Sequence, residues 1–139
     1  MHIEGYHFPD DLKYDRSHFW EKVEGDQVTL GMTDFAVRLA GEFVFADVVE
    51  PGKKVHKDQV FMSVESGKWV GRVMAPVDGE ITAYNEDLEF EPERINEDPY
   101  GKGWLVKIKV YDPSQLAALM DVGMIEPWLK EEIKRVKGE

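Results

Sequence analysis

The sequence between Phe19 and Asn85 consists of short runs of alternating or β-branched residues that are separated by turn residues. This pattern is typical of a small β-sandwich or barrel, in which each strand buries one face and exposes the other. Several of the breaks contain a glycine suited to a turn, namely 24–26, 50–52, 66–68 and 77–79. We therefore predict a mainly β fold, with strands at 19–23, 27–31, 42–48, 60–65, 69–74, 80–84 and 104–111.

Helices are expected inside this β pattern and after it. Thr33 offers N-cap chemistry before a short apolar segment, and Gly41 would end the helix that follows. Asp112 and Pro113 favour a second helix start, because an N-cap residue there precedes a first-turn proline. Apolar residues then fall three or four apart over 125–136. We predict one short internal helix and C-terminal helices at about 113–136.

Length and composition fit one domain. The chain has 139 residues, 42% of them hydrophobic, and we expect a single domain over 1–139 with its β core at about 14–111. No apolar run approaches the roughly eighteen residues needed to cross a bilayer, and the start lacks the basic and apolar regions of a secretion signal. These features predict a cytoplasmic protein with no membrane partner.

The charge and the residue types exclude several function classes. Seventeen basic and 28 acidic residues give a net charge of −11, and the basic patch at 53–57 is too short to favour a nucleic-acid partner. The chain has no cysteine, so any sulfur chemistry must be imported. Its four histidines are scattered without metal-ligand spacing, so no metal site is predicted. No nucleophile, base and orienting group can be assembled, and we predict no catalytic residues.

An acidic cluster occupies residues 86–93. A surface of this charge could form a rim on which a partner protein docks, or it could simply be a solvated loop that follows a strand. Both interpretations remain open.

Lys68 lies in a predicted hairpin turn, between the strands at 60–65 and 69–74. The adjacent Gly67 can take a positive φ, so the turn should be tight and the lysine side chain should project into solvent at the tip. A modifying enzyme could reach a lysine in that position. On composition alone, however, an exposed turn lysine is an ordinary surface charge.

The motifs around Lys68 resemble those of glycine-cleavage H proteins over nearly the whole chain. The most specific is N-E-D-P-Y-G-K-G-W-L at 96–105, which has no generic structural reason to recur. Further matches are Y-x-x-x-H-x-W at 14–20, Glu24-Gly25, Gly31-Met32-Thr33-Asp34, Gly41-Glu42-Phe43-Val44-Phe45, 52–55, Val64-Glu65-Ser66 with Lys68, and Ala75-Pro76-Val77-Asp78-Gly79-Glu80.

This resemblance implies a flattened barrel-sandwich hybrid of two small antiparallel sheets, as in lipoyl and biotinyl carriers. It implies lipoate in amide linkage to Lys68, flanked by Glu65, Ser66, Gly67 and Trp69, on an arm of ~14 Å. The chain would be a non-catalytic carrier, because the reactive sulfurs belong to the cofactor. Biotinyl domains resemble an A-M-K-M pattern, which Gly67 and Trp69 do not match.

The implied partners are a lipoate ligase or lipoyl transferase and the glycine cleavage P, T and L proteins. Three positions depart from the family pattern for holding the aminomethyl amine. Phe19 stands at the glutamate of the H-E-W segment, Leu39 at a histidine, and Arg72 at an aspartate four residues beyond the lysine. A cationic amine would lose two carboxylate partners and meet a like charge instead.

These departures leave aminomethyl carriage in doubt and leave two alternatives open. One is that Arg72 pairs with an anion while Trp69 and Phe19 cover the dithiolane. Arg72 could equally be only a solvated strand residue, and Trp69 only a packing residue. An altered tip of this kind resembles the lipoate-binding carriers that work beside a heterodisulfide-reductase-like complex in sulfur oxidation. The other alternative, from a different class, is an unmodified interaction module that has kept the fold.

Overall fold

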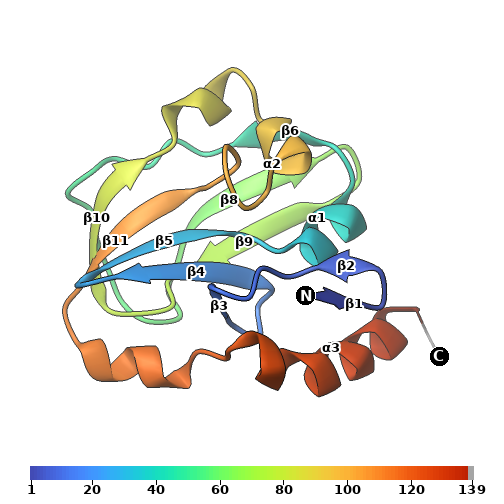
Figure 1. Ribbon diagram of the computed structural model, residues 1–139. Coiled ribbons are helices and arrows are strands. Elements are labelled where there is room, and N and C mark those ends of the chain that lie inside the picture. The colour runs from blue at the N-terminus through green and yellow to red at the C-terminus, as the bar shows by residue number, and fades with distance from the viewer. Residues whose placement is uncertain (138–139) are drawn as a thin grey trace.

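The computed structural model describes residues 1–137, which form three antiparallel sheets (Figure 1). The largest has the strand order β3-β4-β5-β11-β10-β7, and the second has the order β6-β8-β9. These two correspond to the predicted pair of sheets, and a small β1-β2 ribbon adds a third. The strands are β1 His2–Ile3, β2 Tyr6–His7, β3 Lys13–Tyr14, β4 Phe19–Glu24, β5 Gln27–Met32, β6 Phe43–Ala46, β7 Lys54–Val55, β8 Val60–Ser66, β9 Val70–Met74, β10 Gly79–Tyr84 and β11 Val106–Val110.

The main core lies between the six-stranded and three-stranded sheets. The alternation that predicts strands also directs the side chains: in β11, Val106, Ile108 and Val110 are buried, whereas the intervening lysines are more exposed. Val64 of β8 and Val73 of β9 bury the inner face of the smaller sheet in the same cluster. The two sheets therefore hold each other in place through apolar contact.

Helix α1, Asp34–Ala40, packs Ala36, Val37 and Ala40 into this core, whereas its Phe35 belongs to a second apolar cluster. Its predicted caps are confirmed. The Thr33 hydroxyl oxygen accepts a hydrogen bond from the Ala36 N–H at 3.3 Å, and Gly41, at φ 85°, donates its N–H to the Val37 carbonyl at 3.1 Å. The helix consequently ends at the loop that leads into β6.

A second apolar cluster joins the N-terminal segment to helix α3, Val122–Lys137 (Figure 1). Ile125, Leu129 and Ile133 recur every four residues on the buried face of α3, which confirms the predicted C-terminal packing helix. Trp20 belongs to this cluster and lies over Gly31, where an added Cβ would fall 2.4 Å from the indole ring. Gly31 is therefore needed for close packing.

Several elements differ from the prediction. The segment that begins at Asp112 forms a 3₁₀ helix, η2 Pro113–Ala118, and ends before Met120, because Met120 instead pairs with the backbone of Tyr14. The strands expected at 42–48 and 104–111 are shorter in the structure. The two-residue strands, η1 Glu86–Glu89 and α2 Arg94–Glu97 were not predicted, since such short elements show no measurable periodicity.

No helix within residues 1–137 combines the length and the apolar character that a membrane span requires.

Candidate functional site

Strands β8 and β9 form an antiparallel hairpin (Figure 1). Lys68 lies at its tip, as predicted. The last cross-strand pair is Glu65 with Val70, and the turn is closed by the Ser66 N–H, which donates to the Trp69 carbonyl at 2.8 Å. The Ser66 hydroxyl donates to the same Trp69 carbonyl at 3.4 Å. It also accepts a hydrogen bond from the Lys68 backbone N–H at 3.4 Å. Ser66 is buried, so its hydroxyl braces the turn from within.

Gly67 does not take the positive φ that the sequence led us to expect. A Cβ built on this residue would meet nothing within 4 Å. The prediction was wrong because the turn closes with backbone angles that any L residue can adopt. Gly67 therefore leaves the surface beside Lys68 bare without being required for the fold of the turn.

The Lys68 side chain is exposed and extends over the C-terminal end of α1. Its Cε atom lies 3.1 Å from the point where Gly41 would carry a Cβ, so the absence of a side chain there provides the space. A groove of about 430 Å³ runs between the two segments and is lined by 40–42, Val44 and 67–68. Gly41 is thus both the helix cap and the floor beneath the lysine.

Asn96, on helix α2, fixes the loop that forms this floor. Its side-chain amide donates to the Gly41 carbonyl at 2.7 Å, and its side-chain oxygen accepts the Phe43 N–H at 2.8 Å. The sequence motif at 96–105 includes this residue, but nothing in the motif indicated that it holds the loop beneath Lys68. Asn96 and Gly41 are the site residues that sequence reasoning missed.

Trp69 forms a wall of the hairpin tip. Its ring meets the buried Phe43 ring edge-on, with centroids 6.2 Å apart and planes at 77°. A Cβ on Gly71 would lie 2.2 Å from the outer edge of the indole, so the ring rests directly on that glycine. Trp69 nevertheless remains 41% exposed, which leaves an apolar face next to Lys68.

The remaining predicted residues lie at different depths. Glu65 is half-buried in a cross-strand row between Phe45 and Val70. Leu39 is 38% exposed in the last turn of α1, close in sequence to the floor under Lys68, and Arg72 is exposed on β9 opposite Ser63.

Phe19 lies in the main core and is only 4% exposed. It does not line the groove beside Lys68, so its placement gives no support to the prediction that it covers an arm at the surface. The roles of Leu39 and Arg72 around an arm stay predictions.

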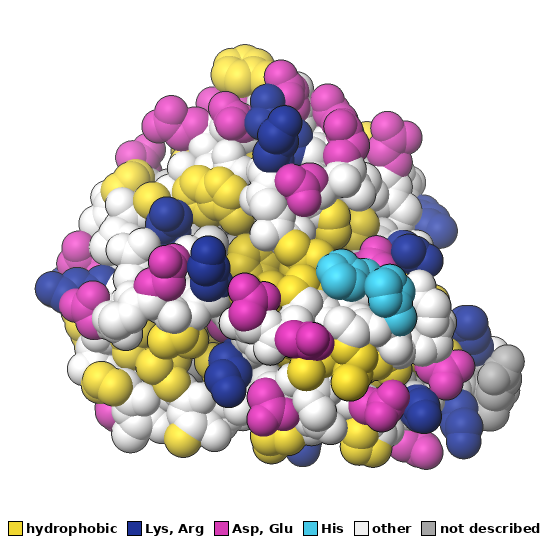
Figure 2. All heavy atoms as spheres, in the orientation of Figure 1, with side chains coloured by type: hydrophobic (Ala, Val, Ile, Leu, Met, Phe, Trp, Pro, Cys, Tyr) yellow, Lys and Arg dark blue, Asp and Glu magenta, His cyan; other side chains and the backbone are white. Residues whose placement is uncertain are grey.

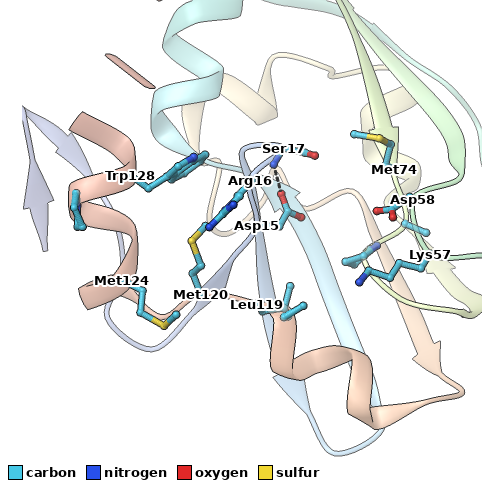
Figure 3. Close-up of a pocket in the computed structure, with 14 residues that line it drawn as sticks. Asp15, Arg16, Ser17, Lys57, Asp58, Met74, Leu119, Met120, Met124 and Trp128 are labelled. Carbon is cyan, nitrogen blue, oxygen red and sulfur yellow. Dashed lines mark hydrogen bonds between the residues drawn. The ribbon is translucent and has the colours of Figure 1, made fainter. Parts of the chain in front are cut away.

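A larger groove of about 620 Å³ lies against α3 and η2 (Figure 3). Met74, at the far end of β9 from the hairpin tip, and Trp128 contribute apolar surface, and the Arg16 side chain extends toward Met120. Asp15 also lines it and accepts the Ser17 N–H at 2.8 Å. This groove contains none of the predicted site residues.

Near this groove, Glu21 is fully buried and neither of its carboxylate oxygens has a hydrogen-bond partner within residues 1–137. Burial raises the pKa of its carboxyl group well above the usual range, and the nearby charge of Asp15 adds to the shift. Burial therefore favours the neutral, protonated form of Glu21 inside the fold.

The two-sheet fold with an exposed lysine at a hairpin tip defines a carrier domain of the barrel-sandwich class. Comparisons identify the family. The model of the glycine cleavage H-protein family matches residues 12–132. Two relatives named glycine cleavage system H protein are similar to the chain: that of Bacillus licheniformis is 42% identical over 89% of this chain and 98% of its own, and that of Halalkalibacterium halodurans is 43% identical over 89% and 97%.

Among solved structures, the chain is similar to the crystal structure of a glycine cleavage system H protein from Mycobacterium marinum. The TM-score is 0.73 and the identity 31%, over 84% of this chain and 94% of that one. The chain therefore belongs to the glycine cleavage H-protein family, a family of lipoyl carriers that are not themselves enzymes.

Proposed function

We propose that this protein is a lipoyl carrier and that Lys68 bears the lipoyl group in amide linkage. The observation that carries the proposal is the placement of Lys68 at an exposed hairpin tip in a chain of this family. The clearance over Gly41 fits the group, because the lysine stem already lies along the groove that an amide-linked arm would follow. When bound, lipoate supplies a disulfide that can be reduced and loaded.

The chain's own residues position the arm. Ser66 and Asn96 fix the two sides of the groove, and Trp69 offers an apolar face beside the attachment point. An arm of ~14 Å on this tip presents its sulfurs to each docked partner at a high effective concentration. The partners that the family implies are the glycine cleavage P, T and L proteins, together with a lipoate ligase or lipoyl transferase.

Intact mass after incubation with lipoate, ATP and a lipoate ligase tests this proposal. We expect the native chain to gain one lipoyl group and Lys68→Ala to gain none. Lys102→Ala, which removes another exposed lysine, is the matched control and should be modified like the native chain. A native chain that stays unmodified would favour an unmodified interaction module, and modification of Lys68→Ala would place the group elsewhere.

A second candidate is a carrier for a heterodisulfide-reductase-like sulfur-oxidation complex. The observation that favours it is chemical: Arg72 and Leu39 occupy positions where the family uses groups that hold an amine, and the exposed Arg72 makes no ion pair within residues 1–137. An anionic cargo would suit Arg72 better than a cationic aminomethyl group.

A glycine decarboxylase exchange assay separates the two candidates. We expect the lipoylated chain to support exchange at least tenfold more slowly than the Bacillus licheniformis H protein, because its arm lacks amine-holding groups. The double variant Arg72→Asp with Leu39→His should recover part of the rate, whereas Lys102→Asp should not. Exchange at the rate of the relative would instead support ordinary aminomethyl carriage.

A further inference from the structure

The acidic cluster at 86–93 contributes to a second pocket, away from the Lys68 groove. Figure 2 shows acidic side chains gathered over η1 and α2 at the top of the molecule. Beneath them lies a pocket of about 480 Å³, formed by the loop 48–51, Tyr84 and η1 with the following Phe90. The pocket therefore joins the hydrophobic side chains of the loop 48–51 to the acidic cluster at 86–93.

Tyr84 supplies an unused polar group in the wall of this pocket. Its side chain is 8% exposed, and its buried hydroxyl oxygen lies beside the Glu89 carboxylate without a hydrogen bond of standard geometry within residues 1–137. Burial first, and then the nearby charge of Glu89, raises the pKa of Tyr84 to about 12. A buried hydroxyl without a partner is unfavourable, so a ligand group that pairs with it would be favoured.

The carboxylates around the pocket are mostly uncompensated. Asp87 forms an ion pair with Arg94 at 3.4 Å, but Glu50, Glu86 and Glu89 have no ion pair within residues 1–137. These carboxylates carry the same charge around one pocket, so a bound cation would be attracted to all of them. In the described part of the chain, no three acidic or histidine side chains converge as metal ligands. The charge distribution therefore suits an extended organic cation better than a metal ion.

The apolar part of the pocket selects among organic cations. Phe90 is 85% exposed and Val48 is also exposed, although both are large hydrophobic side chains. An aromatic face attracts a guanidinium group, and the aliphatic stem of an arginine covers apolar surface while its head reaches carboxylates. We propose that this pocket binds an arginine side chain presented by a partner protein.

The position of the pocket is compatible with simultaneous use of Lys68. Strand β6 starts opposite Ser66 beside the hairpin tip and runs away from it, with Ala46 opposite Val64. Val48 follows two residues further on, which places it on the order of 15 Å along the chain from the tip. A protein docked at the acidic pocket would thus leave the lysine free for chemistry with that partner or another.

Amide chemical shifts of the ¹⁵N-labelled full chain test the proposal, with the peptide acetyl-Ala-Arg-Ala-amide as the probe. We expect saturable shifts confined to 48–51 and 84–90. The same peptide with citrulline, which has the shape of arginine without its charge, should bind at least tenfold more weakly. The double variant Glu86→Gln with Glu89→Gln should weaken binding at least fivefold, and Tyr84→Phe at least twofold, in samples whose remaining spectrum is unchanged.

The matched control is Glu126→Gln with Glu131→Gln on α3, which removes the same charge elsewhere and should leave binding unchanged. The proposal would be overturned if the citrulline peptide bound as tightly as the arginine peptide, or if the shifts extended to α3 as well. It would also be overturned if the Glu86 and Glu89 double variant kept the native affinity. Saturable shifts of the same amides with Mg²⁺ alone would also overturn it, in favour of a metal site. None of these results depends on whether Lys68 is lipoylated.

Discussion

At Gly41 the backbone has a φ of 85°, and the space where a Cβ would stand is 3.1 Å from the Cε atom of Lys68. A side chain at this position would be strained by the backbone and would displace the lysine. We therefore expect Gly41→Ala to lower the free energy of unfolding by about 1–2 kcal/mol. It should also slow the modification of Lys68, since the lysine stem loses its floor.

Gly67→Ala is the matched control, because its Cβ would enter open space at an ordinary φ. Urea unfolding and the initial rate of lipoylation measure the two effects. Equal behaviour of the two alanine variants would show that the clearance at Gly41 is unimportant.

The residues that form the site around Lys68 could be predicted only where neighbouring positions in the sequence determine their place. Lys68 and Ser66 belong to one turn, so the sequence was sufficient to place them at a hairpin tip. Gly41 and Asn96 come to the site from distant parts of the chain, and no local pattern reports such contacts. The positive φ expected at Gly67 failed for a related reason, since a glycine permits that conformation but does not require it.

Among the elements, α2 is a single short turn that buries Ile95 in the main core and holds the loop between α1 and β6 through the Asn96 side chain. Asn96→Ala would leave the Gly41 carbonyl and the Phe43 N–H without partners in a partly buried position. We expect a loss of about 1–3 kcal/mol in the free energy of unfolding. Hydrogen exchange at Phe43 should accelerate in step, because its amide loses its acceptor.

Glu97→Ala, which truncates the exposed neighbour on the same helix, serves as the control and should change neither quantity appreciably. If exchange at Phe43 were as slow in Asn96→Ala as in the native chain, the loop would be held by other contacts.

Strand and helix prediction succeeded for elements of five or more residues with clear periodicity, such as β4, β5 and α3. It failed for β1 to β3, whose two-residue pairings depend on packing against α3 and β4 and leave no repeat in the sequence. The helix predicted after Asp112 became 3₁₀ and short because the chain is then recruited to pair with Tyr14. Tertiary contacts decided those cases.

At the scale of the whole molecule, residues 1–137 contain two apolar clusters, and the mainly β pattern predicted only the one between the sheets. The second depends on Trp20, which faces outward from β4 and is covered by the N-terminal segment and α3. A strand buried on both faces does not alternate, so sequence periodicity could not reveal that layer. The prediction of the β architecture was correct, but it did not include the apolar layer between β4, the N-terminal segment and α3.

We expect the free energy of unfolding of the whole molecule to depend on pH through Glu21. Below about pH 4 this group is neutral in both the folded and unfolded chain, so its ionisation does not change the free energy of unfolding. Above its ordinary pKa of 4.5, the unfolded chain ionises while burial keeps the folded group protonated. The folded state is then penalised with a slope of up to about 1.4 kcal/mol per pH unit until the raised folded pKa is reached.

Glu21→Gln removes the ionisation and should increase the free energy of unfolding clearly at pH 7.5 but hardly at pH 4. Denaturant unfolding at the two pH values measures this difference. Glu24→Gln, on the exposed end of the same strand, should show no such gain. A gain of equal size at both pH values would contradict the assignment of a neutral buried acid.

The packing of the Trp69 ring on Gly71 affects how an arm attached to Lys68 would move. Because the indole ring packs against Phe43 and Gly71, we expect the backbone at the tip to bend little. Motion of an attached arm then begins at the lysine side chain, whose bond rotations take picoseconds to nanoseconds. Rotations that fast are completed many times within any millisecond turnover. The pace of a carrier built this way would be set by how long each partner stays bound, and not by the swing itself.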